Sequence, residues 1–233
     1  MEQIKPALLL LHGALGAHTD FDPVVPALAV HYTVYRFNFH GHGGSPLPVM
    51  PLSIPMFSRQ LLDFIAEQKL APVAVFGYSM GGYVALQAAL EAPEAFSRIQ
   101  TLATKFSWTP DTAAREARRL NAATLREKAP DYAAAQQQLH GEQEWGPLLA
   151  ATAIMMENLG SEPLLTADTL KNITVPVRVM VGDRDAMVSI EETVATYRQL
   201  PQASLTVLPD TKHPLEKVNS AVLIWEIRSF MTV

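Results

Sequence analysis

The chain has 233 residues, of which 48% are hydrophobic and 18% charged, so it is an ordinary globular protein long enough for one domain with its own core. A formal net charge of −5 argues against a nucleic-acid-binding protein, because such proteins present a basic face to the phosphates. The absence of cysteine excludes a disulfide framework, a thiolate nucleophile and a thiolate metal site.

The N-terminal segment indicates neither a signal peptide nor a membrane anchor. The apolar run of residues 7–11 is shorter than a signal-peptide core and no cleavage site follows it. No segment reaches the roughly 18 apolar residues of a membrane span. We therefore expect a cytoplasmic protein whose mature chain begins at Met1 and which binds a small molecule, not nucleic acid or a membrane. The sequence leaves the oligomeric state open.

Short runs rich in Val, Ile and Leu predict buried parallel strands. Four of them are apolar almost throughout, and two more fit the pattern less closely. In chain order the predicted strands are residues 7–13, 32–39, 73–77, 99–104, 175–183 and 203–209, the second and the last being the weaker pair.

Helical segments are predicted between these strands. One spans residues 54–69 after Ser53, a typical N-cap residue, and another spans residues 190–199 after the capping-box residue Ser189. The last covers about 220–231, with its apolar residues on one face. This alternation predicts an α/β fold, a mostly parallel sheet flanked by helices on both faces.

The alternation breaks once along the chain. Between residues 106 and 169 no strand is predicted, only helical segments rich in Ala, Gln, Glu and Arg. A helical insertion in an α/β domain is expected over the strand ends. We therefore predict a core of residues 1–105 and 170–233 with a helical cap, or lid, of residues 106–169.

The residues that follow each strand are candidate site residues, because ligands of open α/β sheets bind beyond the carboxyl ends of the strands. Ser79 follows the third strand in "GYSMGG", Asp183 and Asp185 follow the fifth in "GDRD", and His213 follows the sixth in "TKHP". Serine, aspartate and histidine in this order are the parts of a catalytic triad. Position after the strand does not choose between the two aspartates.

Five segments together resemble the α/β-hydrolase superfamily over nearly the whole chain. "GYSMGG" is similar to the nucleophile elbow, "HGALG" to the oxyanion-hole loop, "HGHGGS" to the turn after the next strand, "GDRD" to the acid turn and "TKHP" to the histidine loop. The resemblance implies a small-capped serine esterase that hydrolyses a small carboxylic ester or related acyl compound. It also implies that no metal or organic cofactor is needed.

The resemblance further implies roles for individual residues. Ser79 would be the nucleophile and His213 the base. The family pattern Gly-x-x-Asp selects Asp185 as the acid and leaves Asp183 as a turn former. The backbone N–H groups of Ala14 and Met80 would form the oxyanion hole.

The residues around these positions have expected structural roles. Gly77 and Gly81 avoid a clash where strand and helix meet tightly at the elbow. His12 and His42 lie in glycine turns, and in the resembled family such residues support loops and do not react.

The cap segment offers weaker candidates for substrate binding. Lys105 and Trp108 follow a strand and could face the substrate, the lysine pairing with a carboxylate. The alternative is a solvated lysine and a tryptophan that packs the cap. Met155 and Met156, with Trp145, indicate an apolar, adaptable lining or, equally, packing against the sheet. A group of cations is predicted to be a solvated helix face: Arg115, Arg118, Arg119, Arg126 and Lys128.

Other functions share these motifs and stay open as alternatives. The lyase of menaquinone biosynthesis has similar glycine-rich segments, but it usually carries an arginine where this chain has Tyr83. A C–C bond hydrolase acting on a diketone-like substrate would use the same triad. A ligand-binding protein on this fold would keep the triad without turnover.

Overall fold

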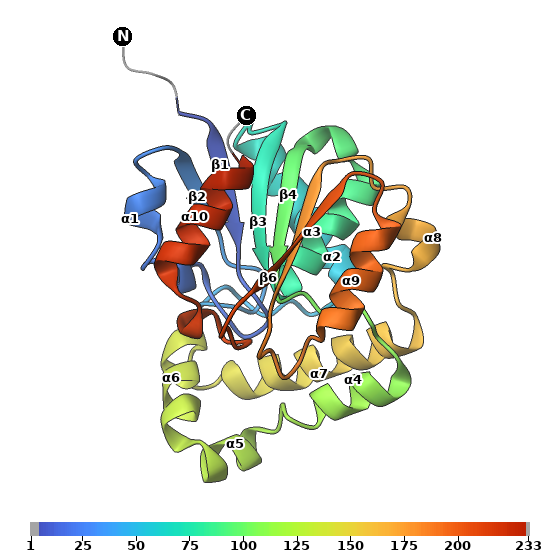
Figure 1. Cartoon of the computed structure of the whole chain (residues 1–233). Helices are drawn as coiled ribbons and strands as arrows, with labels where there is room; N and C mark the ends of the chain where they lie inside the picture. The colour runs from blue at the N-terminus through green and yellow to red at the C-terminus, as the bar shows by residue number, and fades with distance from the viewer. Residues whose placement is uncertain (1–4, 232–233) are drawn as a thin grey trace.

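The computed structural model describes residues 5–231, which form a six-stranded, all-parallel sheet between two layers of helices (Figure 1). Met1, with which we expect the mature chain to begin, lies outside these residues. The strands are β1 (Ala7–Leu11), β2 (Thr33–Arg36), β3 (Val73–Tyr78), β4 (Phe96–Leu102), β5 (Val177–Gly182) and β6 (Ala203–Leu208). The six predicted strands are therefore confirmed, although β1 and β2 end earlier than expected because the chain turns into loops there.

Helices connect the strands in the predicted alternation. The α-helices are α1 (Val25–Leu28), α2 (Ile54–Glu67), α3 (Met80–Glu91), α4 (Pro110–Ala117), α5 (Ala122–Lys128), α6 (Pro130–His140), α7 (Trp145–Ser161), α8 (Ala167–Leu170), α9 (Ile190–Gln199) and α10 (Ser220–Met231). Three short 3₁₀-helices are η1 (His18–Phe21), η2 (Pro93–Ala95) and η3 (Leu215–Lys217). The predicted caps are present: the hydroxyl of Ser53 accepts from the third residue of α2, and Ser189 forms a capping box with Glu192. Within residues 5–231 no helix is both long and apolar enough to cross a membrane.

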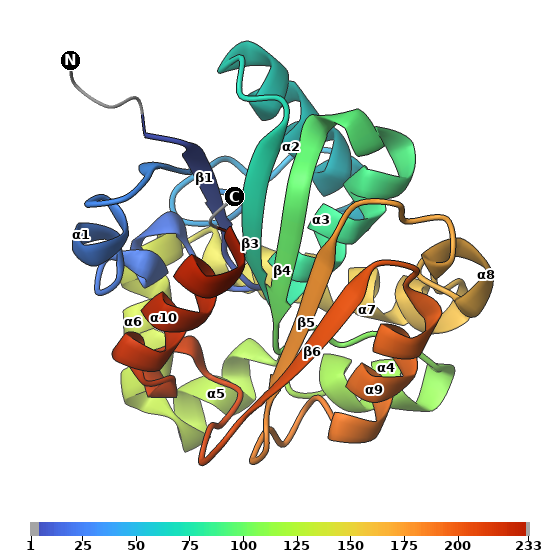
Figure 2. The same cartoon turned by 45° about the horizontal axis from the view of Figure 1, so that its top comes forward.

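The core lies on both faces of the sheet, because alternate strand residues point to opposite sides. Leu9 and Leu11 of β1 join the cluster that includes α2, α3 and α9. Leu8 and Leu10 join the cluster that includes α1 and α10. All four leucines have no exposed surface. Figure 2 shows α1 and α10 on one side of the strands and α2 and α3 on the other.

The segment between β4 and β5 contains α4 to α8 and no strand. Four of these helices, α4 to α7, lie beneath the carboxyl ends of the strands, and we call them the cap helices (Figure 1). Their bounds fall inside the predicted insertion of residues 106–169. The ends of the strands and the cap helices therefore enclose the region where a ligand is expected.

Candidate active site

The strand order β2-β1-β3-β4-β5-β6 creates a crevice at one position. β1 has β2 on one side and β3 on the other, so the connections that leave β1 and β3 diverge. In open α/β sheets this switch point is where ligands bind. Ala14 lies just beyond β1 and Ser79 just beyond β3, so the fold places both predicted site residues at the switch point.

Ser79 lies on a strained turn between β3 and α3. Its backbone angles are φ 50° and ψ −116°, a region that a non-glycine residue rarely adopts. The surrounding bonds hold it there: its N–H donates to the carbonyl oxygen of Leu102 at 2.8 Å, and the hydroxyl of Thr104 donates to its carbonyl oxygen at 2.9 Å. The turn leaves the Ser79 hydroxyl at the start of α3, clear of the sheet.

The two glycines of the turn are required by close backbone packing. A Cβ atom on Gly77 would lie 2.5 Å from the nitrogen of Gly82, and one on Gly81 would lie 2.5 Å from the carbonyl oxygen of Leu11. Backbone atoms cannot yield as a flexible side chain would. The predicted steric role of Gly77 and Gly81 is confirmed.

His213 connects Ser79 to an aspartate. Its Nε2 atom lies 3.5 Å from the Ser79 hydroxyl oxygen, and its Nδ1 atom lies 2.8 Å from Oδ2 of Asp185. The backbone of the histidine is held as well, since the Tyr78 hydroxyl donates to the His213 carbonyl oxygen at 2.8 Å. The structure thus brings together the three side chains that the sequence selects. Tyr78 was not singled out, since nothing in its sequence context distinguishes it from a buried strand residue.

The two candidate aspartates have different environments. The Asp185 side chain is fully buried, and its other oxygen, Oδ1, accepts from the backbone N–H groups of Met187 and Val188 at 2.8 Å each. These bonds orient the carboxylate toward His213 and offset the cost of its burial. The Asp183 carboxylate instead accepts from the N–H of Thr211 at 3.1 Å, as a turn former does.

Two backbone N–H groups beside Ser79 donate to no acceptor among residues 5–231. Met80 is the first residue of α3, where a backbone N–H has no intrahelical partner. No acceptor within residues 5–231 contacts the N–H of Ala14. Ala14 and Met80 line one cavity together with Ser79, so both N–H groups belong to residues beside the hydroxyl.

Three buried histidines support the loops around this cavity. The ring of His42 lies 5.2 Å from that of His12 and 5.9 Å from that of His140, measured between centroids. His12 accepts from the backbone N–H of Phe39 at 3.1 Å. Burial, together with the neighbouring His42, lowers the pKa of His12 well below its ordinary value. Burial also lowers the pKa of His42 to about 4 and lowers that of His140.

His140 belongs to this group although it follows no strand. It is the last residue of α6, and it meets the loops that follow β1 and β2. Sequence reasoning found no role for it, because its neighbours in the group are more than 90 residues away along the chain. The expected supporting role of His12 and His42 agrees with their buried, loop-bound positions.

Two cavities meet at Ser79. The inner cavity is lined mainly by buried apolar side chains. The lining includes the buried methionines Met80, Met155 and Met156 and the partly exposed Met187. The outer groove is bounded by more exposed residues, and His213 lines only this groove. Met155 and Met156 therefore form the predicted apolar lining, whereas Trp145 is fully buried elsewhere, beneath Arg126.

Lys105 and Trp108 both line the inner cavity. The Lys105 side chain is only 5% exposed, so the alternative of a solvated lysine is excluded. Its Nζ atom lies 3.3 Å from Oε2 of Glu192 and 5.7 Å from the centre of the Trp108 ring. Glu192 completes the capping box that the sequence predicts at Ser189. Its contact with Lys105 joins residues 87 positions apart and was not predicted.

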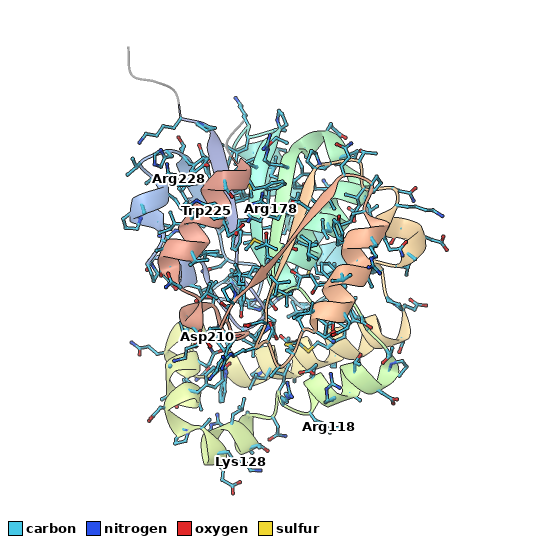
Figure 3. The ribbon with its side chains drawn as sticks, in the orientation of Figure 1. Arg118, Lys128, Arg178, Asp210, Trp225 and Arg228 are labelled. Carbon is cyan, nitrogen blue, oxygen red and sulfur yellow. The ribbon has the colours of Figure 1, made fainter. Side chains whose placement is uncertain are left out.

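The remaining cap cations lie mostly on the outer surface. Figure 3 labels Arg118 and Lys128, which lie at the side of the cap helices that faces away from the sheet. Arg115 and Arg119 are half exposed and pair with the buried carboxylate of Glu116. Within residues 5–231 no group of three or more histidine or carboxylate side chains has the arrangement of a metal site.

Comparison with known proteins identifies the family of the chain. A family model described as "Alpha/beta hydrolase family" matches residues 8–219, which is most of the chain. The chain belongs to the alpha/beta hydrolase family. Its predicted superfamily and its α/β fold class are thereby confirmed.

Several hydrolases are similar to this chain in sequence. The (E)-2-((N-methylformamido)methylene)succinate hydrolase of Acinetobacter baylyi is 24% identical over 94% of this chain and 89% of its own length. Pimeloyl-[acyl-carrier protein] methyl ester esterase of Xylella fastidiosa is 35% identical, but only over 42% of this chain and 37% of its own length.

Solved structures share the fold at low sequence identity. The 2-hydroxy-6-oxo-6-phenylhexa-2,4-dienoate hydrolase of Rhodococcus sp. RHA1 has a TM-score of 0.80 at 22% identity and covers 97% of this chain and 90% of its own. A thermophilic esterase of Thermogutta terrifontis has a TM-score of 0.80 at 22% identity and covers 97% of this chain and 89% of its own.

Proposed function

We propose that the protein is a serine hydrolase that cleaves a small carboxylic ester or related acyl compound through an acyl-enzyme. The observation that carries the proposal is the series of contacts from the Ser79 hydroxyl to Nε2 of His213 and from Nδ1 of His213 to the buried Asp185. A nucleophile, a base and an orienting carboxylate in such a series are the requirements for acyl transfer.

The proposed reaction has two steps. His213 accepts the proton of the Ser79 hydroxyl as its oxygen attacks the carbonyl carbon, and then donates a proton to the leaving group. Asp185 holds the imidazole in the tautomer with hydrogen on Nδ1 and stabilises the imidazolium. The N–H groups of Ala14 and Met80 would donate to the tetrahedral oxyanion. Water, activated by the same His213, then hydrolyses the acyl-enzyme.

The lining of the inner cavity favours a hydrolase over the lyase alternative. A lyase that holds a polyanionic substrate requires several arginines, whereas Lys105 is the cation among the described residues that line this cavity. Where that lyase carries an arginine, Tyr83 is buried and its hydroxyl accepts from the N–H groups of Leu164 and Leu165 at 3.2 and 2.9 Å. Tyr83 thus has a packing role in this chain.

The cap helices would complete the proposed site. Met155 and Met156 of α7 line the inner cavity, and Glu116 and Arg119 at the end of α4 line the outer groove. We therefore propose that residues 106–169 act as a cap that shapes both cavities around a small-molecule substrate. Lys105, just before the cap, and Trp108, at its start, are proposed substrate-binding residues.

The test uses p-nitrophenyl acetate and the variant Ser79→Ala. We expect kcat/KM to fall by about 10⁴ or more, because a triad without its nucleophile loses the acyl-enzyme route. The matched control is Ser161→Ala at an exposed position on α7, which should retain normal turnover. A serine-directed phosphonate should add its mass at Ser79. Near-normal turnover by Ser79→Ala, or labelling elsewhere, would contradict the proposal.

A further inference from the structure

The position of His213 assigns the two halves of the substrate to the two cavities. In acyl transfer the base must deliver its proton to the leaving group, so the leaving group lies on the side of the histidine. His213 lines the outer groove and not the inner cavity. If the proposed function holds, the leaving group therefore occupies the outer groove and the acyl group occupies the inner cavity.

Among the described residues that line the inner cavity, Lys105 is the charged one. Its ammonium is buried, lies 5.7 Å from the centre of the Trp108 ring and makes only long hydrogen bonds. An ammonium has three N–H donors. Among the residues that the structure describes, its acceptors are Glu192 at 3.3 Å and the carbonyl oxygen of Met187 at 3.5 Å. Both distances exceed the usual range of 2.7–3.2 Å for such bonds. At least one donor of a buried cation is thus available at the wall of the cavity.

Glu192 does not depend on Lys105 for its own hydrogen bonds. Its Oε1 atom accepts from the backbone N–H groups of Phe106 at 3.0 Å and Ser107 at 3.2 Å, and Oε2 accepts from Ser189 at 3.3 Å. This fixed carboxylate already balances the charge of the lysine. A second carboxylate, brought by the substrate, would leave one negative charge buried without a counterion, which is costly. A neutral oxygen acceptor avoids this cost.

We propose that Lys105 is a specificity-determining residue whose Nζ donates a hydrogen bond to a neutral oxygen of the acyl group, so that the preferred substrates are esters of oxo acids. The methionines around the inner cavity contact the aliphatic part of the acyl chain. Their flexible side chains allow the chain length to vary. The proposal rests on the hydrolase function above and adds the substrate class of the same site.

The test compares p-nitrophenyl esters that share a leaving group. The 4-oxopentanoate ester is matched with the 4-methylpentanoate ester, in which a methyl branch replaces the carbonyl oxygen, and with the succinate half-ester, which carries a carboxylate. A second pair, 5-oxohexanoate and 5-methylhexanoate, moves the oxygen by one carbon. We expect one of the oxo esters to exceed its methyl analogue in kcat/KM by about 10-fold or more, the effect of a hydrogen bond to a charged group, and to exceed the succinate half-ester.

Variants of Lys105 and of control residues then show which residue causes the preference for the oxo ester. Lys105→Met should bring the ratio of oxo to methyl ester close to one, and Lys105→Gln, which keeps an N–H donor, should give an intermediate ratio. Lys171→Met, at an exposed lysine, should leave the ratio unchanged. The Tyr83 hydroxyl also lines the cavity and has a hydrogen to donate, so Tyr83→Phe tests it as an alternative donor, and this variant should keep the ratio.

The outcomes separate this inference from the proposed function. If the wild-type protein hydrolyses all esters equally, or prefers the succinate half-ester, the inference is wrong while the hydrolase function stands. Loss of the preference in Tyr83→Phe and not in Lys105→Met would also overturn it. If no ester is hydrolysed, and Ser79→Ala changes nothing, the proposed function itself fails. The ester comparison needs only the wild-type protein, so it decides even where a Lys105 variant does not fold.

Discussion

The Nε2 atom of His140 donates a hydrogen bond to the carbonyl oxygen of Leu15 at 3.0 Å, which ties the last residue of α6 to the loop after β1. The Nδ1 atom of the same ring accepts from the N–H of Gly43 at 2.9 Å. One neutral imidazole therefore joins a cap helix to two core loops. Leu15 has a positive φ of 60° and directly follows Ala14, so His140 helps to hold the proposed oxyanion donor in place.

We therefore expect His140→Phe to lower kcat by about 10-fold with a smaller change in KM. The two lost hydrogen bonds position an N–H group that acts mainly in the transition state, and each bond contributes about 1 kcal/mol. Steady-state kinetics with p-nitrophenyl acetate measures this effect. The exposed His31→Phe provides the control. A rise in KM at constant kcat would assign His140 to substrate binding instead.

Substitution of the two aspartates in the turn after β5 should have clearly different effects on kcat. Asp185→Asn is expected to lower kcat about 10³–10⁴-fold, because an amide in contact with Nδ1 favours the wrong imidazole tautomer. Asp183→Asn should change kcat by less than about 10-fold, since Asp183 bonds only to the turn that contains Thr211. Comparable losses in both variants would refute the assignment of Asp185.

The packing of the elbow predicts opposite effects of alanine at two glycines. Gly77→Ala should destabilise the fold by more than about 2 kcal/mol, because its Cβ would meet the backbone of Gly82 at 2.5 Å. Gly146→Ala, on α7 and with no atom within 4 Å of the added Cβ, should raise the free energy of unfolding by up to about 1 kcal/mol. Urea denaturation of both variants tests the pair, and equal stabilities would show that the elbow can relax.

The buried histidines predict that stability falls with acid. In the folded protein burial lowers the pKa of His42 to about 4, whereas in the unfolded chain it is about 6.5. The unfolded state thus binds more protons below pH 6.5, so the stabilisation present at neutral pH is lost as the pH falls toward 4. His42 alone should lower the free energy of unfolding by about 2 kcal/mol between pH 7 and pH 5.

Urea denaturation at both pH values measures this loss. His42→Gln should reduce the difference between pH 7 and pH 5, and His31→Gln, at an exposed position, should leave it unchanged. An unchanged difference in His42→Gln would mean that other groups cause the acid sensitivity.

The sequence predicts the fold well because its signals are local. Buried strands such as β3 and β5 are apolar almost throughout, and residues such as Ser53 and Ser189 act within one turn of their helix. Ser79, His213 and the two aspartates became candidates for a related reason, since each follows a strand, and parallel strands bring such residues to one edge of the sheet. The choice of Asp185 over Asp183 came from the family pattern Gly-x-x-Asp.

Contacts that depend on tertiary packing could not be predicted in this way. The pairing of Lys105 with Glu192 and the contact between His140 and Leu15 join segments that are far apart in sequence. Lys105 lies beside the helical insertion and His140 lies within it. In this part of the chain no periodic pattern or strand end shows which way a side chain points. The lining of the inner cavity was foreseen at Met155 and Met156 but not at Met187, which lies in a loop.

The close packing around Gly77 and Gly81 also affects how active relatives can be identified from their sequences. Both glycines are fixed by contacts with backbone atoms that no choice of neighbouring side chain could relieve. Selection would therefore keep the two glycines in any descendant that retained this turn, including one whose Ser79 had been replaced and whose activity was gone. The two glycines therefore indicate the shape of the turn and do not indicate activity. A survey that seeks active relatives should therefore filter on Ser79, Asp185 and His213 together.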